Sequence, residues 1–374
     1  MGQFKVIHFS TVHSPSDVRI FRKQCVTLVN AGWDVTLVTA ASQSDANEAC
    51  DQSGVQLVIL PPSGGRISRM TVTMLRMLWF LIWHRADIYH FHDPELLLIG
   101  FILRALGRRV IYDVHEDVPA AILNRHWVPP KLRIPIAGVA NRMETLGGRW
   151  LSGVIGATPH IASRFPPQKT AVVQNYPVIQ LDDEQARFSA DNGVERVVFV
   201  GWISLERGIG QVVKALELVN QKRPVRLALA GNYHSNIAQV LEQSPGWQYV
   251  DFLGWQTRPQ VAKLLASSRA GVVTFLPIPN HVESQPNKLF EYMSAGLPVI
   301  ASDFPLWREF VGDRGQLVDP ENPQAIADAM LYYLEHPDEA RQAGERGRQA
   351  VQERFNWQAE SRELIAIYDR VMAA

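Results

Sequence analysis

The chain has 374 residues, of which 47% are hydrophobic, and its 37 Lys and Arg balance 37 Asp and Glu. This length favours two domains, each large enough to bury its own core. The even charge gives no sign of a nucleic-acid partner. Two cysteines, Cys25 and Cys50, are too few for a disulfide framework and lack metal-ligand spacing. We therefore expect a globular protein of the cytoplasm.

The first half of the chain alternates short apolar strands with helices. Residues 5–9 indicate a buried strand rather than a signal peptide. Strands are then predicted at 34–39, 55–60, 87–91 and 109–113, and helices at 18–32, 70–85 and 96–106. Such alternation is typical of a doubly wound, mostly parallel α/β sheet.

The pattern stops at a polar stretch and then restarts. We predict a linker at 179–194, then strands at 195–200, 225–230, 247–253, 270–275 and 299–302, with helices at 209–219 and 261–266. The predicted organisation is an N-terminal Rossmann-like domain (1–178) and a second one (195–356). We expect the two domains to face each other across a cleft.

The most informative segment is Glu283 to Asp303, ESQPNKLFEYMSAGLPVIASD. Pro286 suits the start of a helix, and Gly296 with Pro298 ends it before a strand. A helix N-terminus near Lys288 would attract an anion through its free amides and dipole. Lys288 puts a positive charge in this first turn, which only a bound phosphate would favour. Glu283 and Glu291 flank the turn, eight residues apart, and carboxylates accept sugar or ribose hydroxyls.

This segment resembles the E-x7-E region of retaining GT-B glycosyltransferases of family four, the bacterial group that builds lipopolysaccharide, capsule and exopolysaccharide. The resemblance covers nearly the whole chain. It implies that Glu283 contacts the transferred sugar and Glu291 the nucleotide ribose. It also implies that the last helix, 357–374, packs back on the first domain.

A second segment, VFVGWISLERG (198–208), matches the family's diphosphate clamp in part. Arg207 stands where the family has Lys and keeps the charge, but Trp202 replaces the usual Arg. The resemblance assigns catalysis to four residues and donor binding to five others. The catalytic residues are His115, Glu283, Arg207 and Lys288; the donor-binding residues are Gly201, Trp202, Asn287, Leu289 and Glu291.

Three segments of the first half match the acceptor side of the family. In TVHSPSDVRIF (11–21), His13, Asp17 and Arg19 repeat a pattern of one branch, although Asp17 is equally suited to cap a helix. In YDVHED (112–117), His115 lies at a strand end beside the donor sugar, and Glu116 either binds acceptor hydroxyls or, like Asp117, caps a helix. In DIYHFHD (87–93), His90 points into the core, while His92 and Asp93 approach the cleft.

The resemblance implies transfer of a hexose from a nucleoside-diphosphate sugar to a glycan or polyprenyl-linked acceptor in cell-surface polysaccharide synthesis. No D-x-D motif occurs in the sequence, so we expect neither a metal ion nor any other cofactor. Two alternatives stay open: a catalytically inactive sugar-nucleotide-binding subunit, and another GT-B enzyme such as a sugar-nucleotide epimerase.

Basic residues gather in the first domain. From Arg66 to Arg149 the sequence contains twelve Lys and Arg but only seven Asp and Glu. They flank the apolar stretch that contains Trp79 and Trp83, and a second one that begins near Trp127. We expect peripheral docking on an anionic inner membrane face, with burial of the first stretch as the alternative.

Overall fold

The computed structural model describes residues 3–40, 53–62, 64–65, 68–124, 128–178, 195–233 and 235–374. These divide into two compact units, Met1–Asn175 with Trp357–Ala374, and Tyr176–Asn356. The predicted linker, 179–194, lies outside the described residues.

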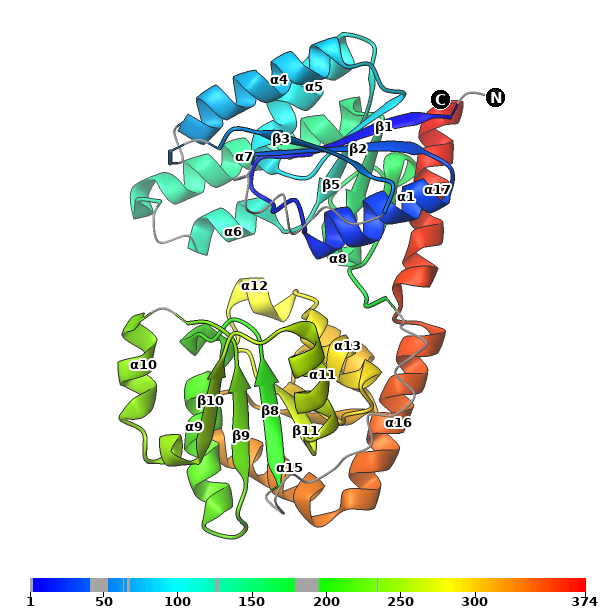
Figure 1. The fold of residues 1–374 in the computed structure, drawn as a ribbon. Coiled ribbons are helices and arrows are strands. Elements are labelled where there is room, and N and C mark those ends of the chain that lie inside the picture. The colour runs from blue at the N-terminus through cyan, green and yellow to red at the C-terminus, as the bar shows by residue number, and fades with distance from the viewer. Residues whose placement is uncertain are drawn as a thin grey trace. The chain divides into compact units, whose positions relative to one another are not determined.

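Unit 1 is built on a seven-stranded parallel sheet of order β3-β2-β1-β4-β5-β6-β7 (Figure 1). Its strands are β1 (Lys5–Ser10), β2 (Asp34–Ala40), β3 (Gln56–Leu60), β4 (Ile88–Phe91), β5 (Arg109–Val114), β6 (Gly153–Gly156) and β7 (Thr170–Val172). The strands are apolar on both faces because helices cover both sides. One face packs against the π-helical segment Val18–Cys25, α1 (Val26–Asn30) and α17 (Trp357–Ala373). The other packs against α4 (Met74–Trp83), α5 (Leu97–Ala105), α7 (Pro130–Trp150) and α8 (Pro159–Ala162).

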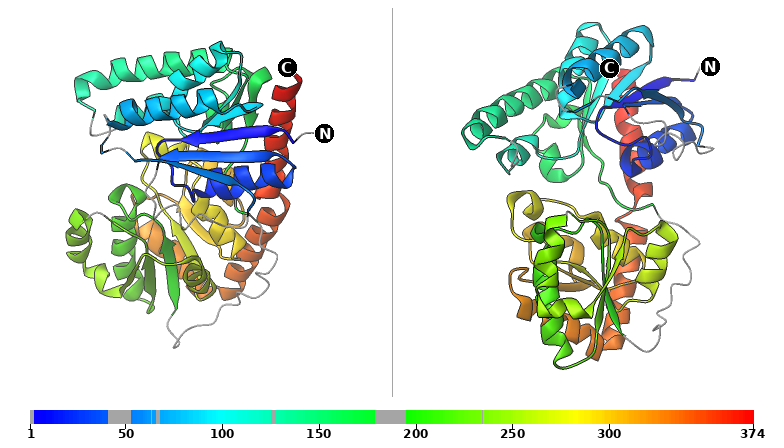
Figure 2. Two further views of the ribbon diagram at one scale, coloured as in Figure 1. Left: turned by 45° about the horizontal axis from the view of Figure 1, so that its top comes forward. Right: turned by 60° about the vertical axis from the view of Figure 1, so that its left-hand side comes forward.

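Unit 2 repeats this plan with a six-stranded parallel sheet of order β10-β9-β8-β11-β12-β13. The strands are β8 (Arg196–Val200), β9 (Arg226–Ala230), β10 (Val250–Gly254), β11 (Ala270–Val273), β12 (Val299–Ser302) and β13 (Gly315–Val318). Helices α9 (Ile209–Asn220) and α15 (Pro323–Glu335) cover one face. Helices α13 (Asn287–Ser294), α14 (Pro305–Val311) and α16 (Pro337–Glu353) cover the other (Figure 2). The prediction of two doubly wound α/β domains is confirmed.

Several predicted boundaries shift. The helix predicted at 18–32 is π-wound over its first eight residues, Val18–Cys25. The strand predicted at 247–253 is shorter, because Pro245 opens the 3₁₀ turn Pro245–Tyr249 and the strand begins only at Val250. The strand predicted at 270–275 ends at Val273, where the chain turns to meet the loop after β8.

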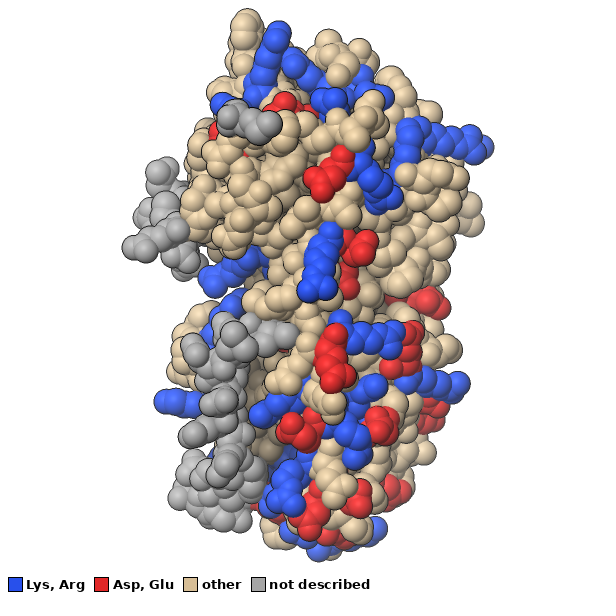
Figure 3. All heavy atoms as spheres, turned by 90° about the vertical axis from the view of Figure 1, so that its right-hand side faces the viewer, with Lys and Arg blue, Asp and Glu red and all other residues tan. Residues whose placement is uncertain are grey.

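The surface of unit 2 carries both signs of charge, close together. Arg308 pairs with Asp303, Arg341 with Asp338 and Arg346 with Asp313, all largely exposed. Figure 3 shows this mixture on one face, over the lower part of the picture. Such exposed pairs contribute little to stability, because water and salt screen them. They indicate a solvated surface rather than a charged binding face.

Candidate donor and acceptor sites

In unit 2, the loop after β8 positions Arg207. The strand ends at Gly201, and the 3₁₀ turn Leu205–Arg207 leads to Gly208, which starts α9 with φ 74°. A Cβ at Gly208 would lie 1.8 Å from the Thr274 carbonyl oxygen, so only glycine allows this approach. The Leu276 amide also donates to the Glu206 carbonyl. The turn is thereby fixed against the segment that follows β11.

The second part of this site is the start of α13. Pro286 caps the helix and accepts from the Leu289 amide, whereas the amides of Asn287 and Lys288 precede the first acceptor within the helix. Lys288 lies in this turn, and its Nζ is 2.5 Å from Glu291 Oε2. The sequence analysis predicted that a bound phosphate offsets the charge of Lys288, and it named no other partner. The structure corrects this, because Glu291 already neutralises it.

Arg207 and Lys288 meet at Gly201. A Cβ placed on Gly201 would lie 3.5 Å from Lys288 Cε and 3.6 Å from Arg207 Nη1. The guanidinium of Arg207 stacks on Phe275 and donates to the Trp202 carbonyl at 3.3 Å. Burial lowers the pKa of Arg207, yet no carboxylate within the described ranges pairs with it. A partly desolvated cation without an acidic partner favours an anionic ligand.

The other predicted donor residues differ in placement. Trp202 is 41% exposed, so its side chain is not core packing. Asn287 and Glu283 are exposed, and the short helix α12 (Pro279–Val282) brings the chain to Glu283. Leu289 is fully buried, and its amide donates to the Pro286 carbonyl. The assignment of Leu289 to donor contact is therefore corrected, because neither its side chain nor its amide is available.

In unit 1, the carboxylate of Asp113 organises a second site at the ends of β4 and β5. Arg19 grips both of its oxygens, with Nη2 at 2.7 Å from Oδ1 and Nε at 3.1 Å from Oδ2. Oδ2 also accepts from Gln24 at 2.8 Å, from His115 Nε2 at 2.9 Å and from His92 Nδ1 at 3.2 Å. Burial would raise the pKa of Asp113, but Arg19 and His115 hold it well below its usual range. Asp113 is therefore an ionised acceptor.

His115 is the member of this group that reaches the surface, with 19% of its side chain exposed. Its ring lies 4.9 Å from that of His13. His13 in turn bonds Asp17 at 3.2 Å and faces Asp93 at 3.5 Å. Burial would lower the pKa of His13, but these carboxylates outweigh it and raise the pKa.

Both roles foreseen for Asp17 meet in one side chain, since it also caps its helix by accepting from the Ile20 amide at 2.9 Å. Asp93 is almost fully buried and accepts from Ser10 and from the Thr11 amide, so it holds the loop after β1. His92 is equally buried. Both residues therefore lie deeper than the sequence analysis predicted, which expected them to approach the cleft.

Arg19 and Glu116, both predicted on the acceptor side, are placed differently. The Arg19 side chain is buried and bonds Asp113 and the Val173 carbonyl, so it supports the site rather than facing an acceptor. Glu116 is exposed and its acceptor role stays a prediction, whereas Asp117 caps α6 (Val118–Asn124) through the Ala120 amide.

Sequence reasoning missed Asp113, His8 and Gln24. The available signal was a carboxylate inside the otherwise apolar strand RVIYDV. Two side-chain groups within the described residues are close enough to share a metal ion: His8, His90 and His92, and His92, Asp113 and His115.

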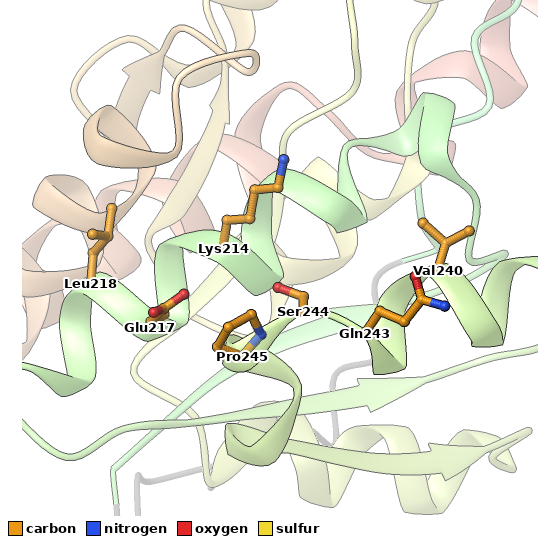
Figure 4. A pocket seen from close by; sticks show the side chains of 7 residues that line it. All are labelled: Lys214, Glu217, Leu218, Val240, Gln243, Ser244 and Pro245. Carbon is orange, nitrogen blue, oxygen red and sulfur yellow. The ribbon is translucent and has the colours of Figure 1, made fainter.

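A hollow of about 520 Å³ in unit 2 is lined by neither Arg207 nor Lys288 (Figure 4). Helices α9 and α10 (Ser235–Glu242) line it with the segment that follows, and its charged residues are Lys214 and Glu217. The hollow is therefore separate from the residues predicted to bind the donor.

Two known families match the chain, one for each unit. Residues 18–175 match the "Glycosyl transferase 4-like domain", and residues 194–336 match "Glycosyl transferases group 1". The chain belongs to the group 1 glycosyltransferases. It is a hexosyltransferase with the GT-B fold, and the predicted resemblance is confirmed at this level.

Relatives of known activity are distant. The glycosyltransferase is 23% identical over 325 residues to the MMP alpha-(1->4)-mannosyltransferase of Mycolicibacterium hassiacum, covering 80% of this chain and 74% of the relative. It is 22% identical over 298 residues to the glycogen synthase of Mycobacterium tuberculosis, covering 76% and 69%. The O-antigen chain mannosyltransferase B of Escherichia coli is 25% identical over 176 residues, covering 46% and 45%.

Solved structures share the fold over nearly the whole chain. Sucrose-phosphate synthase from Thermosynechococcus elongatus superposes with a TM-score of 0.76 at 16% identity, covering 99% of this chain and 100% of that one. Anabaena HepE in complex with UDP-glucose gives 0.74 at 15% identity, covering 98% and 100%. At such low identity these matches describe the fold alone.

Proposed function

We propose that this enzyme transfers a hexose, with retention of anomeric configuration, from a nucleoside-diphosphate sugar to a hydroxyl of a glycan or polyprenyl-linked acceptor, in the synthesis of a cell-surface polysaccharide. The observation that carries the proposal is the meeting of Arg207 and Lys288 at Gly201, beside the start of α13. Two cations and a helix N-terminus at one point suit a diphosphate. A structurally similar protein in complex with UDP-glucose and two mannosyltransferase relatives support a sugar nucleotide as donor.

The ion pair between Lys288 and Glu291 suggests how the donor is received. When a diphosphate arrives, Lys288 exchanges the carboxylate for a phosphate oxygen, and Glu291 becomes free to accept ribose hydroxyls. Arg207 faces the same phosphates from the loop after β8. As the diphosphate leaves, these charges stabilise it, and such preorganised electrostatics is commonly the largest catalytic contribution. Glu283 is assigned to the transferred sugar, as the family resemblance implies.

Retention requires that the acceptor approach the face from which the diphosphate departs. We assign no nucleophilic residue, and the leaving phosphate helps to deprotonate the acceptor hydroxyl. His115 is assigned to a sugar hydroxyl. Its Nε2 is held by Asp113, so Nδ1 is the nitrogen left to bond the hydroxyl.

A screen of nucleotide sugars by thermal shift tests the proposal, because the true donor stabilises the folded protein by about 2.7 kcal/mol at one hundred times its Kd. The selected donor is then assayed for transfer and for the anomer formed. Glu291→Ala should weaken donor binding in calorimetry, whereas the exposed Glu345→Ala on α16 should not. Equal affinity in both variants would remove Glu291 from the site, and an inverted anomer would contradict retention.

Trp202, in place of the family's Arg, favours the inactive sugar-nucleotide-binding subunit as the second candidate. Donor binding without hydrolysis or transfer would identify it. Conversion of the sugar nucleotide without any acceptor would instead identify an epimerase.

We further propose that transfer needs no metal ion, since Arg207 and Lys288 supply the positive charge. Activity should survive dialysis against EDTA. A rate that falls under EDTA and returns with Mg²⁺ or Mn²⁺ would overturn this.

Unit 1 is proposed to dock on an anionic membrane. Trp79 and Trp83 on α4 are each 67% exposed, so this helix is not simply buried. Helix α5 contacts both α4 and α7. On α7, the side chain of Ile134 is 77% exposed. No acidic residue occurs from 52 to 86, and the basic residues near these helices include Arg76, Lys131 and Arg133. Exposed aromatics beside basic side chains match an anionic bilayer surface.

Arg66, Arg125 and Trp127 of the predicted docking region lie outside the described residues. No helix in the described part of the chain is long and apolar enough to span a bilayer.

Sedimentation with vesicles containing anionic lipid tests the docking surface. Binding should weaken with salt, with Lys131→Glu plus Arg133→Glu, and with Trp79→Ala plus Trp83→Ala. Trp255 of unit 2 is equally exposed, at 68%, so Trp255→Ala is the matched control. If the wild-type protein stays in the supernatant at low salt, a soluble acceptor becomes the better proposal.

A further inference from the structure

A line of hydrogen bonds crosses the core of unit 1 behind the acceptor-side site. Tyr368 of α17 is fully buried, and its hydroxyl lies 2.7 Å from His90 Nδ1 and 2.9 Å from His8 Nε2. His8 Nδ1 lies 3.0 Å from His92 Nε2, and His92 Nδ1 bonds Asp113. These side chains share one face of the sheet because β1 and β4 pair in parallel with His8 beside His90. The line therefore joins the last helix of the chain to the carboxylate that holds His115.

The proton positions along this line follow from its end. Burial lowers the pKa of His8, of His90 and, to about 4, of His92, so all three rings are neutral. An ionised Asp113 can only accept, so His92 carries its proton on Nδ1, and its bare Nε2 accepts from His8 Nδ1. His8 Nε2 is then bare and accepts from the Tyr368 hydroxyl. That hydroxyl in turn accepts from His90 Nδ1.

The far end of the line agrees with this direction. Only one nitrogen remains, His90 Nε2, and it is buried without a hydrogen-bond partner in the described structure. In the derived arrangement it is an acceptor that carries no proton. Every donor in the line thus points toward Asp113.

The Tyr368 hydroxyl satisfies the end of this order that is farthest from Asp113. Without its donated proton, His8 Nε2 would be a buried acceptor without a donor, which is unfavourable unless the His8 ring shifts. Such a shift would be passed on at the 3.0 Å contact to the His92 ring. The His92 ring lies 5.5 Å from that of His115 and contacts the same Asp113 oxygen.

We propose that Tyr368 is a positioning residue for His115, acting through the hydrogen bonds that join His8 and His92 to the Asp113 carboxylate. The proposal rests on the proposed function for the role of His115. The order of protons along the line is independent of the proposed function.

A metal ion shared by His8, His90 and His92 is the competing explanation. A metal ion would take a bare nitrogen from each ring and would replace the hydrogen bonds between them. The metal content of the purified protein therefore distinguishes the two explanations.

Side-chain NMR of the ¹⁵N-histidine-labelled wild-type protein reads the tautomers of these rings directly. We expect His8 and His92 neutral with the proton on Nδ1. A proton on Nε2 of His8, or one equivalent of zinc in elemental analysis of the purified protein, would overturn the proposal. This measurement holds even if a variant fails to fold.

Tyr368→Phe keeps the ring and removes the hydroxyl. We expect kcat to fall about 10- to 100-fold, as for a displaced catalytic group, with the donor KM unchanged, the ¹⁵N resonance of His8 Nε2 shifted and its proton still on Nδ1. Tyr89→Phe is the control, because Tyr89 is equally buried on β4 but bonds only the backbone of residues 84 and 86. An unchanged kcat in Tyr368→Phe, or an equal loss in Tyr89→Phe, would overturn the proposal. An unchanged kcat in His115→Ala would instead overturn the proposed role of His115.

Discussion

At the scale of single residues, Arg207 is distinguished by what surrounds its charge. Its guanidinium is half-buried, lies over the Phe275 ring and donates to one backbone carbonyl. Trp202 has replaced the second cation that the family normally places in this loop. Arg207 and Lys288 therefore carry the charge neutralisation proposed for the diphosphate.

Arg207→Ala should lower kcat/KM about 100-fold or more, in the range found when one stabilising donor is removed from a transition state. Arg207→Lys should retain more activity, because it keeps the charge. Steady-state kinetics with the selected donor measure both. Equal losses would show that the planar, bidentate geometry of Arg is required, and normal rates in both would place the diphosphate elsewhere.

At the scale of elements, the turn between β8 and α9 fixes Arg207 in place. The φ of 74° at Gly208 and its approach to the Thr274 carbonyl leave no room for a side chain. Helix α13 fixes Lys288 in the same way. Its first turn carries Lys288, and the buried side chains of Leu289 and Phe290 hold the helix in the core.

Gly208→Ala should therefore destabilise unit 2, by about 1–3 kcal/mol for the backbone conformation alone and more for the clash. Urea unfolding would measure this loss. Gly210→Ala, two residues along, meets nothing closer than 3.6 Å and serves as the control. A variant as stable as the wild type would show that the loop can move away from Thr274 without cost.

At the scale of the whole molecule, the two units differ in their buried histidines. His8, His90 and His92 of unit 1 have pKa values held down by burial, that of His92 at about 4. In the unfolded chain they titrate near 6.5, so below that pH the unfolded state binds protons that the folded state does not. His13 acts in the opposite direction, because its pKa is raised.

Unit 1 should therefore lose stability as the pH falls from about 6.5 towards 4, by up to about 1.4 kcal/mol per pH unit for each of the three rings. Limited proteolysis with peptide mapping at pH 7 and pH 5 would show which unit opens first. Within the described part of unit 2, His281 has a lowered pKa but is only partly buried. Equal acid sensitivity of both units would contradict the expected neutrality of the three rings.

The sequence by itself determined the fold class and singled out most residues of the proposed donor site. Strand and helix periodicities are local, so ten of the thirteen strands in the described residues were predicted with boundaries a few residues off, whereas the short strands β6, β7 and β13 were not predicted. The residues proposed to bind the donor were also found from local signals, because Lys288 and Glu291 lie on one turn of a helix and Arg207 in a short loop. Their pairing was not foreseen, although the i, i+3 spacing permits it.

The acceptor-side site was decided by the tertiary structure. His13, Asp17 and His115 were singled out, but the residue that organises them, Asp113, was not. Its partners come from the segment after β1, from β4 and from the loop after β5, and the line behind it joins His8 to Tyr368, 360 positions later. Strand order and register bring these residues together, and no short spacing in the chain encodes either. In the sequence, a buried carboxylate is visible only as a polar residue in an apolar strand. Its hydrogen-bond partners are determined by packing.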